Sequence, residues 1–428
     1  MAALVCLAGC LPQPDDLSLI RARNAMAQDR ADWARRYYAE DRLRHPDRLE
    51  SLLGEAVAWS TGYQRSRAQT RELLRQYLEV QPRDQEALVR YINELLVVRD
   101  QAEAEGRLEF LDGSADSDFL RARVEAIRRP ERALDLVVSV LDRAPENAAA
   151  WALKAELEDQ LGRQALSISS AQRALALDPF RYSTVYLLAR QYRRMGKIQA
   201  ADDALEMHEI VAALQADGTR KAVSASEELD LLESLRPFID SEAGVFRARL
   251  VAALFRAGRV TEAIAEAERE IDERIHPVSE LASLAVIADE AGARALARRL
   301  FEEITDRQPE HVGAQASLVM LDLEAGRLEG AGARLADAKT AHPDFARLVY
   351  LGGRLALVQG DGDEAVEAFD CALLLAPWEW QWRAALAELH LARGDRTALK
   401  RIVDEAPETP PGWQEWVARH QKALDKKQ

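Results

Sequence analysis

Apolar residues recur along most of the chain at spacings of three and four, which is the pattern of a helix with one buried stripe. Two stretches that show it are AQRALAL at residues 171–177 and AVEAFDCALLL at residues 365–375. Ala, Leu, Arg and Glu, all strong helix formers, dominate the composition, and runs of β-branched residues are scarce. The pattern therefore predicts an all-α protein.

Glycine, proline and alanine each recur with a period of 34 residues. The glycines are Gly258, Gly292, Gly326, Gly360 and Gly394, with Gly162 and Gly196 upstream. The prolines are Pro309, Pro343, Pro377 and Pro411, and the alanines are Ala263, Ala297, Ala331 and Ala365. Glycine suits the left-handed cap of a first helix, and proline ends a second helix because it cannot continue the hydrogen bonding. Each period is therefore predicted to be a helical hairpin that stacks on its neighbours to bury its apolar stripe.

Counting on this period gives about eleven hairpins. They are expected to start near residues 15, 51, 85, 114, 148, 182, 244, 278, 312, 346 and 380. The first three are unevenly spaced, so residues 15–113 are predicted to hold degenerate units, and residues 114–215 and 244–411 regular ones. Residues 412–428 are predicted to form a cap helix with a polar outer face.

Residues 216–243 interrupt the regular array. They begin with a loop-like stretch, and Ser224 and Glu227 then fit a capping box in front of the apolar run LDLLESL. A loop and one extra helix are expected here. The segment is either a degenerate repeat or a hinge or docking insertion.

The repeat resembles the tetratricopeptide repeat (TPR), whose motif runs W-x2-L-G-x2-Y, then A, F, A and P. The unit at residues 346–378 supplies Gly353, Ala365, Phe369, Ala372 and Pro377, with Gly360 at the turn between its helices. It has Val349 and Ala356 where the family has its tryptophan and first tyrosine. The resemblance covers most of the chain and implies a right-handed superhelical solenoid that binds proteins and has no catalytic activity.

The resemblance also implies a concave groove lined by positions 2, 5, 9, 12 and 13 of the first helices. Carried onto two units, these positions are Tyr186, Arg190, Arg193 and Arg194, and Arg347, Tyr350 and Arg354. Tyrosine and arginine are enriched at binding hot spots, and an arginine fork can hold a carboxylate of a bound peptide. Alternatively, these arginines pair with neighbouring acids such as Glu156. The Lys and Asn set of the family's carboxylate clamp is not reproduced.

Tryptophans cluster late in the chain, at Trp378, Trp380 and Trp382 and at Trp413 and Trp416. Rings packed in the core would stabilise the last repeats. Exposed rings would instead form a protein contact or an anchor at a membrane interface. Both readings stay open for Trp378, Trp380 and Trp382.

Composition and charge exclude several classes of protein. The formal net charge of -15 disfavours a nucleic-acid partner, whose phosphates select basic surfaces. Three cysteines and seven histidines give neither a disulfide framework nor metal-ligand spacing, so we expect no metal and no cofactor. No stretch of 18 or more apolar residues is present, and no phosphate loop or catalytic constellation was found, so an enzyme is not expected.

The first residues, MAALVCLAGC, resemble the lipobox of bacterial lipoproteins in Leu7-Ala8-Gly9-Cys10. The resemblance implies cleavage before Cys10 and lipid attachment at Cys10, with residues 1–14 as a signal remnant and tether. The usual positive n-region is missing, because no Lys or Arg precedes Arg21. Leu11 rather than Asp follows Cys10, which by the same likeness implies the outer membrane.

Together these features predict a lipid-anchored, periplasm-facing scaffold of the bacterial cell envelope. It would dock protein partners in a pilus or secretion, polysaccharide-export or cell-wall assembly. The alternatives are a non-catalytic accessory subunit of a membrane enzyme complex and a soluble cytoplasmic adaptor.

Overall fold

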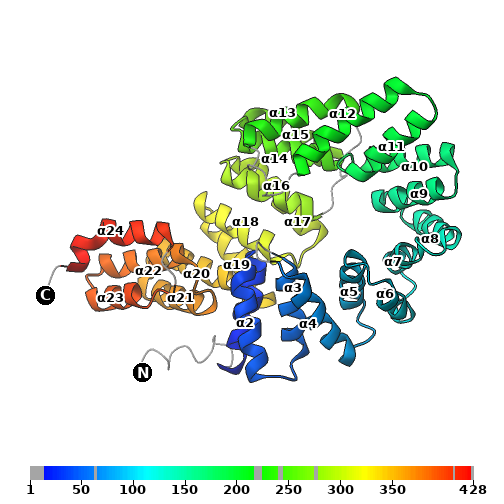
Figure 1. Cartoon of the computed structure of the whole chain (residues 1–428). Helices are drawn as coiled ribbons and strands as arrows, with labels where there is room; N and C mark the ends of the chain where they lie inside the picture. The colour runs from blue at the N-terminus through cyan, green and yellow to red at the C-terminus, as the bar shows by residue number, and fades with distance from the viewer. Residues whose placement is uncertain are drawn as a thin grey trace. The chain divides into compact units, whose positions relative to one another are not determined.

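The computed structural model describes residues 14–61, 65–215, 224–239, 244–273, 278–407 and 410–425. Every regular element within these ranges is a helix, and none of them contains a strand (Figure 1). The prediction of an all-α fold is therefore confirmed.

Most helices follow one another in pairs. The pairs in the first half are α1 (Leu17–Ala27) with α2 (Ala31–Arg44), α3 (Leu49–Ser60) with α4 (Arg67–Val80), α5 (Gln85–Val97) with α6 (Gln101–Arg107), α7 (Ala115–Glu125) with α8 (Pro130–Arg143), α9 (Ala148–Gln160) with α10 (Gln164–Leu177), and α11 (Tyr182–Arg194) with α12 (Ile198–Gln215). The pairs in the second half are α14 (Gly244–Arg256) with α15 (Val260–Glu273), α16 (Val278–Glu290) with α17 (Arg294–Arg307), α18 (Val312–Glu324) with α19 (Leu328–Ala341), α20 (Ala346–Gln359) with α21 (Gly362–Leu375), and α22 (Trp380–Ala392) with α23 (Arg396–Asp404). Across the described ranges the pairs number eleven, as the 34-residue period predicts.

The first helix of each pair begins where the period places it. The predicted and observed starts coincide in eight of the eleven pairs and differ by one or two residues in the other three. All seven periodic glycines have a positive φ, and Gly360, at φ 88°, forms the left-handed C-cap of α20. A side chain is strained in this backbone conformation, which explains why glycine recurs there.

Two α-helices stand outside the pairs. Helix α13 (Ala225–Leu235) lies in the interruption, and the capping box predicted at Ser224 and Glu227 is present at its start. Helix α24 (Pro411–Asp425) follows the last pair, where a cap helix is predicted. Three short 3-10 helices complete the described elements, at Pro14–Asp16, Leu108–Phe110 and Arg236–Phe238.

The chain divides into two compact units. The central unit is Leu78–Leu300, and the terminal unit combines Met1–Tyr77 with Phe301–Gln428. The division passes through α4 and α17. The first hairpins therefore belong to the same unit as the last ones. The order of the repeats along the sequence does not predict this.

One hydrophobic cluster joins the two ends of the chain inside the terminal unit. It contains Leu19, Trp33 and Tyr37 from α1 and α2 together with Phe369 and Trp378 from the C-terminal repeats. The rings of Trp33 and Trp378 lie 5.7 Å apart, and those of Tyr37 and Trp378 lie 6.1 Å apart. In Figure 1 the blue first helices accordingly meet the yellow and orange helices of the C-terminal repeats.

Hydrogen bonds also join the two ends of the chain at this junction. The buried Asn24 side chain donates to the Asp344 carbonyl oxygen (2.9 Å) and accepts from the Ala346 backbone N–H (2.8 Å). Ala346 is the first residue of α20, so Asn24 caps a helix that lies 322 residues further along the chain. Arg21 Nε donates to the Leu374 carbonyl oxygen at 2.8 Å, and Trp378 Nε1 donates to Gln28 Oε1 at 2.9 Å.

Candidate partner-binding surfaces

Two features of the sequence bear on where a partner binds: the lipobox and the first-helix residues. Cys10 lies outside the described residues. In the parts of the chain that the structure describes, no helix is long and apolar enough to cross a membrane. The same parts contain no group of three or more His, Cys, Asp or Glu side chains that could hold a metal ion.

The arginines predicted on α11 pair with acidic side chains. Arg190 and Arg194 both form ion pairs with Asp159 of α9, and the Arg194 pair measures 2.9 Å. Arg193 lies 3.7 Å from Asp202, with both side chains exposed. The acid that Arg190 and Arg194 hold is thus Asp159 rather than Glu156, and this pairing joins neighbouring hairpins.

Tyr186 remains open to solvent beside these arginines. Its side chain is 52% exposed, and its ring centroid lies 5.5 Å from that of His208 on α12. Tyr182 is exposed in the same way and packs on the same histidine at 5.9 Å. The two tyrosines and His208 therefore form an exposed aromatic group on the hairpin of α11 and α12.

The predicted residues of α20 lie at different depths. Tyr350 is buried, with its ring 4.8 Å from the ring of Trp382 and 5.2 Å from that of Phe369. Arg354 is half-buried and donates to the Tyr350 hydroxyl at 3.3 Å. Burial raises the pKa of Glu379, and the positive charges of Arg30 and Arg347 act against that rise. This part of α20 thus contributes mainly to the interior of the terminal unit.

The three clustered tryptophans are also largely enclosed. Trp378 and Trp382 are buried at 4% and 8% exposure, and Trp380 is half-buried against Gly412 of α24. Of the two alternatives that the sequence left, packing in the core agrees with the burial of Trp378 and Trp382. Trp413 and Trp416 stack at 5.1 Å and are buried as well.

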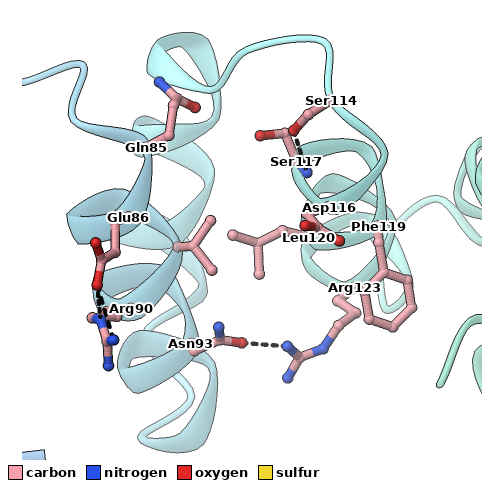
Figure 2. A pocket seen from close by; sticks show the side chains of 11 residues that line it. Gln85, Glu86, Arg90, Asn93, Ser114, Asp116, Ser117, Phe119, Leu120 and Arg123 are labelled. Carbon is pink, nitrogen blue, oxygen red and sulfur yellow. Dashed lines mark hydrogen bonds and ion pairs between the residues drawn. The ribbon is translucent and has the colours of Figure 1, made fainter. Parts of the chain in front are cut away.

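An open groove lies between α5 and α7 in the central unit, with a cavity of about 570 Å³ (Figure 2). Counting from the first residue of each helix, its lining includes positions 2, 5 and 9 of both: Glu86, Val89, Asn93, Asp116, Phe119 and Arg123. These are the positions that face the groove in the TPR family. The cavity thus lies in the units of α5 and α7, and not in the units of α11 and α20 that were singled out from the sequence.

Position 9 forms a polar row along four consecutive first helices: Asn93, Arg123, Glu156 and Arg190. Arg123 of α7 donates to the side-chain oxygen of Asn93 on α5, and Figure 2 shows the two side chains reaching toward each other. Desolvation lowers the pKa of Arg123 and raises the pKa of Glu156. Glu156 nevertheless stays exposed, and a concave surface explains this combination because it surrounds a side chain without sealing it from water.

The start of α7 is held by Asp112 and Ser114. Ser114 caps the helix by accepting from the Ser117 backbone N–H, and Asp112 accepts from the Ser114 N–H (3.0 Å) and the Ser117 hydroxyl (2.6 Å). These hydrogen bonds lower the pKa of Asp112 to about 2. They fix where α7 begins, and therefore which of its side chains line the groove.

The start of α7 differs by one residue from the start that the period predicts. The period starts the unit near residue 114, but Ser114 is the N-cap and the helix begins at Ala115. With the earlier start, position 9 falls on the buried Ala122 instead of Arg123. Serine is a preferred N-cap, so the identity of residue 114 was the available signal for the correct register.

Comparisons with known proteins give similar solved structures and no family assignment. No family model and no curated protein matches it. The solved structures similar to it include Cut9 of the APC/C Cut9-Hcn1 hetero-tetramer, at 12% identity over 97% of this chain and 98% of that chain, with a TM-score of 0.36. Yeast Tom70 has 14% identity over 96% of each chain and a TM-score of 0.37. A thermophilic TPR protein of Thermus thermophilus has 26% identity over 42% of this chain and 99% of that chain, with a TM-score of 0.35.

The chain is an all-α array of TPR-type hairpins. Because these TM-scores lie below 0.5, that description rests on the chain's own 34-residue period, its paired helices and its positive-φ glycines. A fold of this type provides a binding geometry without specifying a ligand.

Proposed function

We propose that this chain is a non-catalytic protein-interaction scaffold that binds a segment of a partner protein in the groove between α5 and α7. The observation that carries the proposal is the cavity of about 570 Å³ lined by positions 2, 5 and 9 of two adjacent first helices. Most side chains of its lining are polar or charged, and Val89, Phe119 and Leu120 add an apolar part that can receive a side chain of the partner. The groove also contains the first two residues of the polar row at position 9, Asn93 and Arg123, and this row continues to α9 and α11.

We further propose that the scaffold belongs to the bacterial cell envelope and is anchored through lipid on Cys10. The support is the lipobox likeness, together with the way the first described residues are held to the terminal unit. Arg48 pairs with Asp16 at 2.8 Å, and His45 Nε2 lies 3.1 Å from the Asp15 carbonyl oxygen. An anchor at Cys10 would keep this unit next to the membrane, where the scaffold would serve a pilus or secretion, polysaccharide-export or cell-wall assembly.

A photo-crosslinker tests the groove directly. We expect p-benzoylphenylalanine in place of Phe119 to capture one partner protein in cells of the native organism, identified by mass spectrometry. The matched control places the same crosslinker at Val138, an exposed apolar residue on α8, the second helix of that hairpin. Equal capture at both positions, or none at position 119, would show that the groove is not the docking surface.

Intact mass of the protein purified from native membranes tests the anchor. We expect the mass of a chain that begins at Cys10 and carries a diacyl or triacyl modification, which the Cys10→Ser variant lacks. Several acyl chains anchor a protein stably, whereas one gives only marginal binding. An unmodified chain that retains residues 1–10 in the soluble fraction would contradict the anchor and favour the cytoplasmic adaptor.

A further inference from the structure

Arg123 is a half-buried cation whose hydrogen bond goes to a neutral side chain. Two other arginines on first helices nearby have acidic partners: Arg90 pairs with Glu86 at 2.9 Å, and Arg190 pairs with Asp159. Arg123 instead donates to the Asn93 side-chain oxygen, and the negative charge of Glu156, at position 9 of α9, opposes the lowering of its pKa by desolvation. A desolvated cation whose hydrogen bond goes to a neutral amide can still donate a forked pair of hydrogen bonds to an incoming carboxylate.

Apolar side chains line the groove one helical turn before this cation. Val89 and Phe119 occupy position 5 of α5 and α7, and Leu120 lies next to Phe119. Figure 2 shows Leu120 pointing into the space between the two helices. The groove therefore places an apolar subsite and a cationic subsite side by side.

The spacing of the two subsites sets the spacing of their ligands. Positions 5 and 9 are four residues apart, which is roughly 6 Å along a helix axis. An extended chain covers nearly that distance in two residues, since it rises about 3.3 Å per residue, and its alternate side chains point the same way. Side chains at i and i+2 of an extended segment can therefore reach both subsites at once.

The acids of the groove offer less to a basic segment. Glu86 is already held by Arg90, and Asp116 is an exposed side chain at the start of α7, where the positive end of the helix dipole favours its charge. A lysine or arginine of a partner would compete with these interactions, whereas a carboxylate at Arg123 displaces a bond to a neutral amide and competes with the charge of Glu156.

We propose that the groove between α5 and α7 binds an extended segment of a partner protein in which an apolar residue and an Asp or Glu stand two residues apart. The apolar side chain enters the cavity beside Val89, Phe119 and Leu120, and the carboxylate forks onto Arg123. This inference rests on the proposed scaffold function and names the chemistry of its partner.

Short synthetic peptides test it on the full chain. The probes are fluorine-labelled, acetylated and amidated hexapeptides with a central Leu-Ser-Glu, with Gln in place of Glu, and with Glu moved next to Leu. A fourth probe carries a free C-terminal carboxylate in place of the glutamate side chain. Fluorine NMR titration measures each dissociation constant, and we expect Leu-Ser-Glu to bind about tenfold or more tightly than the other three.

Three variants locate the carboxylate. Arg123→Gln should weaken the Leu-Ser-Glu peptide to the level of the Gln peptide, and Arg123→Lys should restore part of the affinity because it keeps the charge but loses the fork. Arg190→Gln is the matched control, since the same helix position there is already paired with Asp159, and it should leave the affinity unchanged. Thermal unfolding of each variant verifies that the fold is intact.

The inference is overturned if the Glu and Gln peptides bind equally or if Arg123→Gln has no effect. It is also overturned if the free C-terminal carboxylate is preferred, or if Leu-Ser-Glu shows no saturable binding up to about 1 mM. Crosslinking at position 119 separates the two proposals. A partner still captured there by the Arg123→Gln variant overturns the inference but leaves the scaffold function standing, whereas no capture at position 119 in the chain that retains Arg123 removes both.

Discussion

Replacing Trp378 with alanine is expected to lower the free energy of unfolding of the terminal unit by about 3–5 kcal/mol, the cost of deleting a large buried ring. Trp378 is only 4% exposed and lies against Trp33 and Tyr37 of the first hairpin. It also donates a hydrogen bond to Gln28. The variant therefore removes packing and a polar contact from the junction between the two ends of the chain.

Urea unfolding and amide hydrogen exchange of the full chain measure this effect. Exchange should accelerate in Leu17–Ala27, although that helix lies about 350 residues away in the sequence, because the hairpin of α1 and α2 loses its packing partner. Trp378→Phe is the control for the hydrogen bond alone and should cost about 1 kcal/mol beyond the small change in packing. Unchanged protection of α1 in Trp378→Ala would contradict the contact between the chain ends.

Phe369→Ala should likewise cost about 3–5 kcal/mol in the free energy of unfolding, by leaving a cavity inside the hairpin of α20 and α21. Phe369 is fully buried and stacks on Tyr350 at 5.2 Å. Gly353 lies against the same ring, where a Cβ atom would come within 2.7 Å of Phe369. Since the ring already fills the space between the helices, Gly353→Ala alone should overpack the site and cost about 1–3 kcal/mol.

The double variant makes this prediction specific. In Phe369→Ala the methyl group of Gly353→Ala points into the new cavity, so the pair should be less destabilised than the sum of the single variants. A coupling of about 1–2 kcal/mol is expected, and urea unfolding of all four proteins gives it as a double-mutant cycle. Alanine has a higher helix propensity than glycine, but this effect of Gly353→Ala cancels in the cycle because it is the same whether or not the Phe369 ring is present. Additive effects would mean that Gly353 and Phe369 do not share the space that the structure assigns to them.

The contact of Phe369 with Gly353 and the contacts of Trp378 with the first hairpin differ in how far the sequence predicted them. Phe369 and Gly353 were identified from the sequence as motif positions of one repeat, and their contact spans only 16 residues. The sequence showed Trp378 only as a member of a tryptophan cluster, and it did not decide between packing in the core and an exposed contact. Its partners Trp33 and Tyr37 carry no signal that connects them to residue 378.

The sequence singled out residues of α11 and α20, whereas the cavity lies between α5 and α7. Positions 2, 5 and 9 of first helices line the groove, yet the register of α7 depended on Ser114 acting as an N-cap. The arginines of α11 were predicted to bind a partner, with pairing to neighbouring acids as the alternative, and the coordinates show that Asp159 holds two of them. A one-residue shift rotates a helix face by about 100°, so a period of 34 residues cannot by itself resolve which side chain lines a groove.

The sequence by itself determined that the chain is helical, that its helices come in pairs, and where nearly every pair begins. It could do so because glycine caps, proline stops and apolar stripes act through the local conformation of a few residues. Only the tertiary structure decided that the first hairpin packs on the last repeats, and that Arg123 lies in a groove with its hydrogen bond to a neutral amide. Those facts depend on how distant segments meet, and that follows from the path of all the chain between them, which no local pattern encodes.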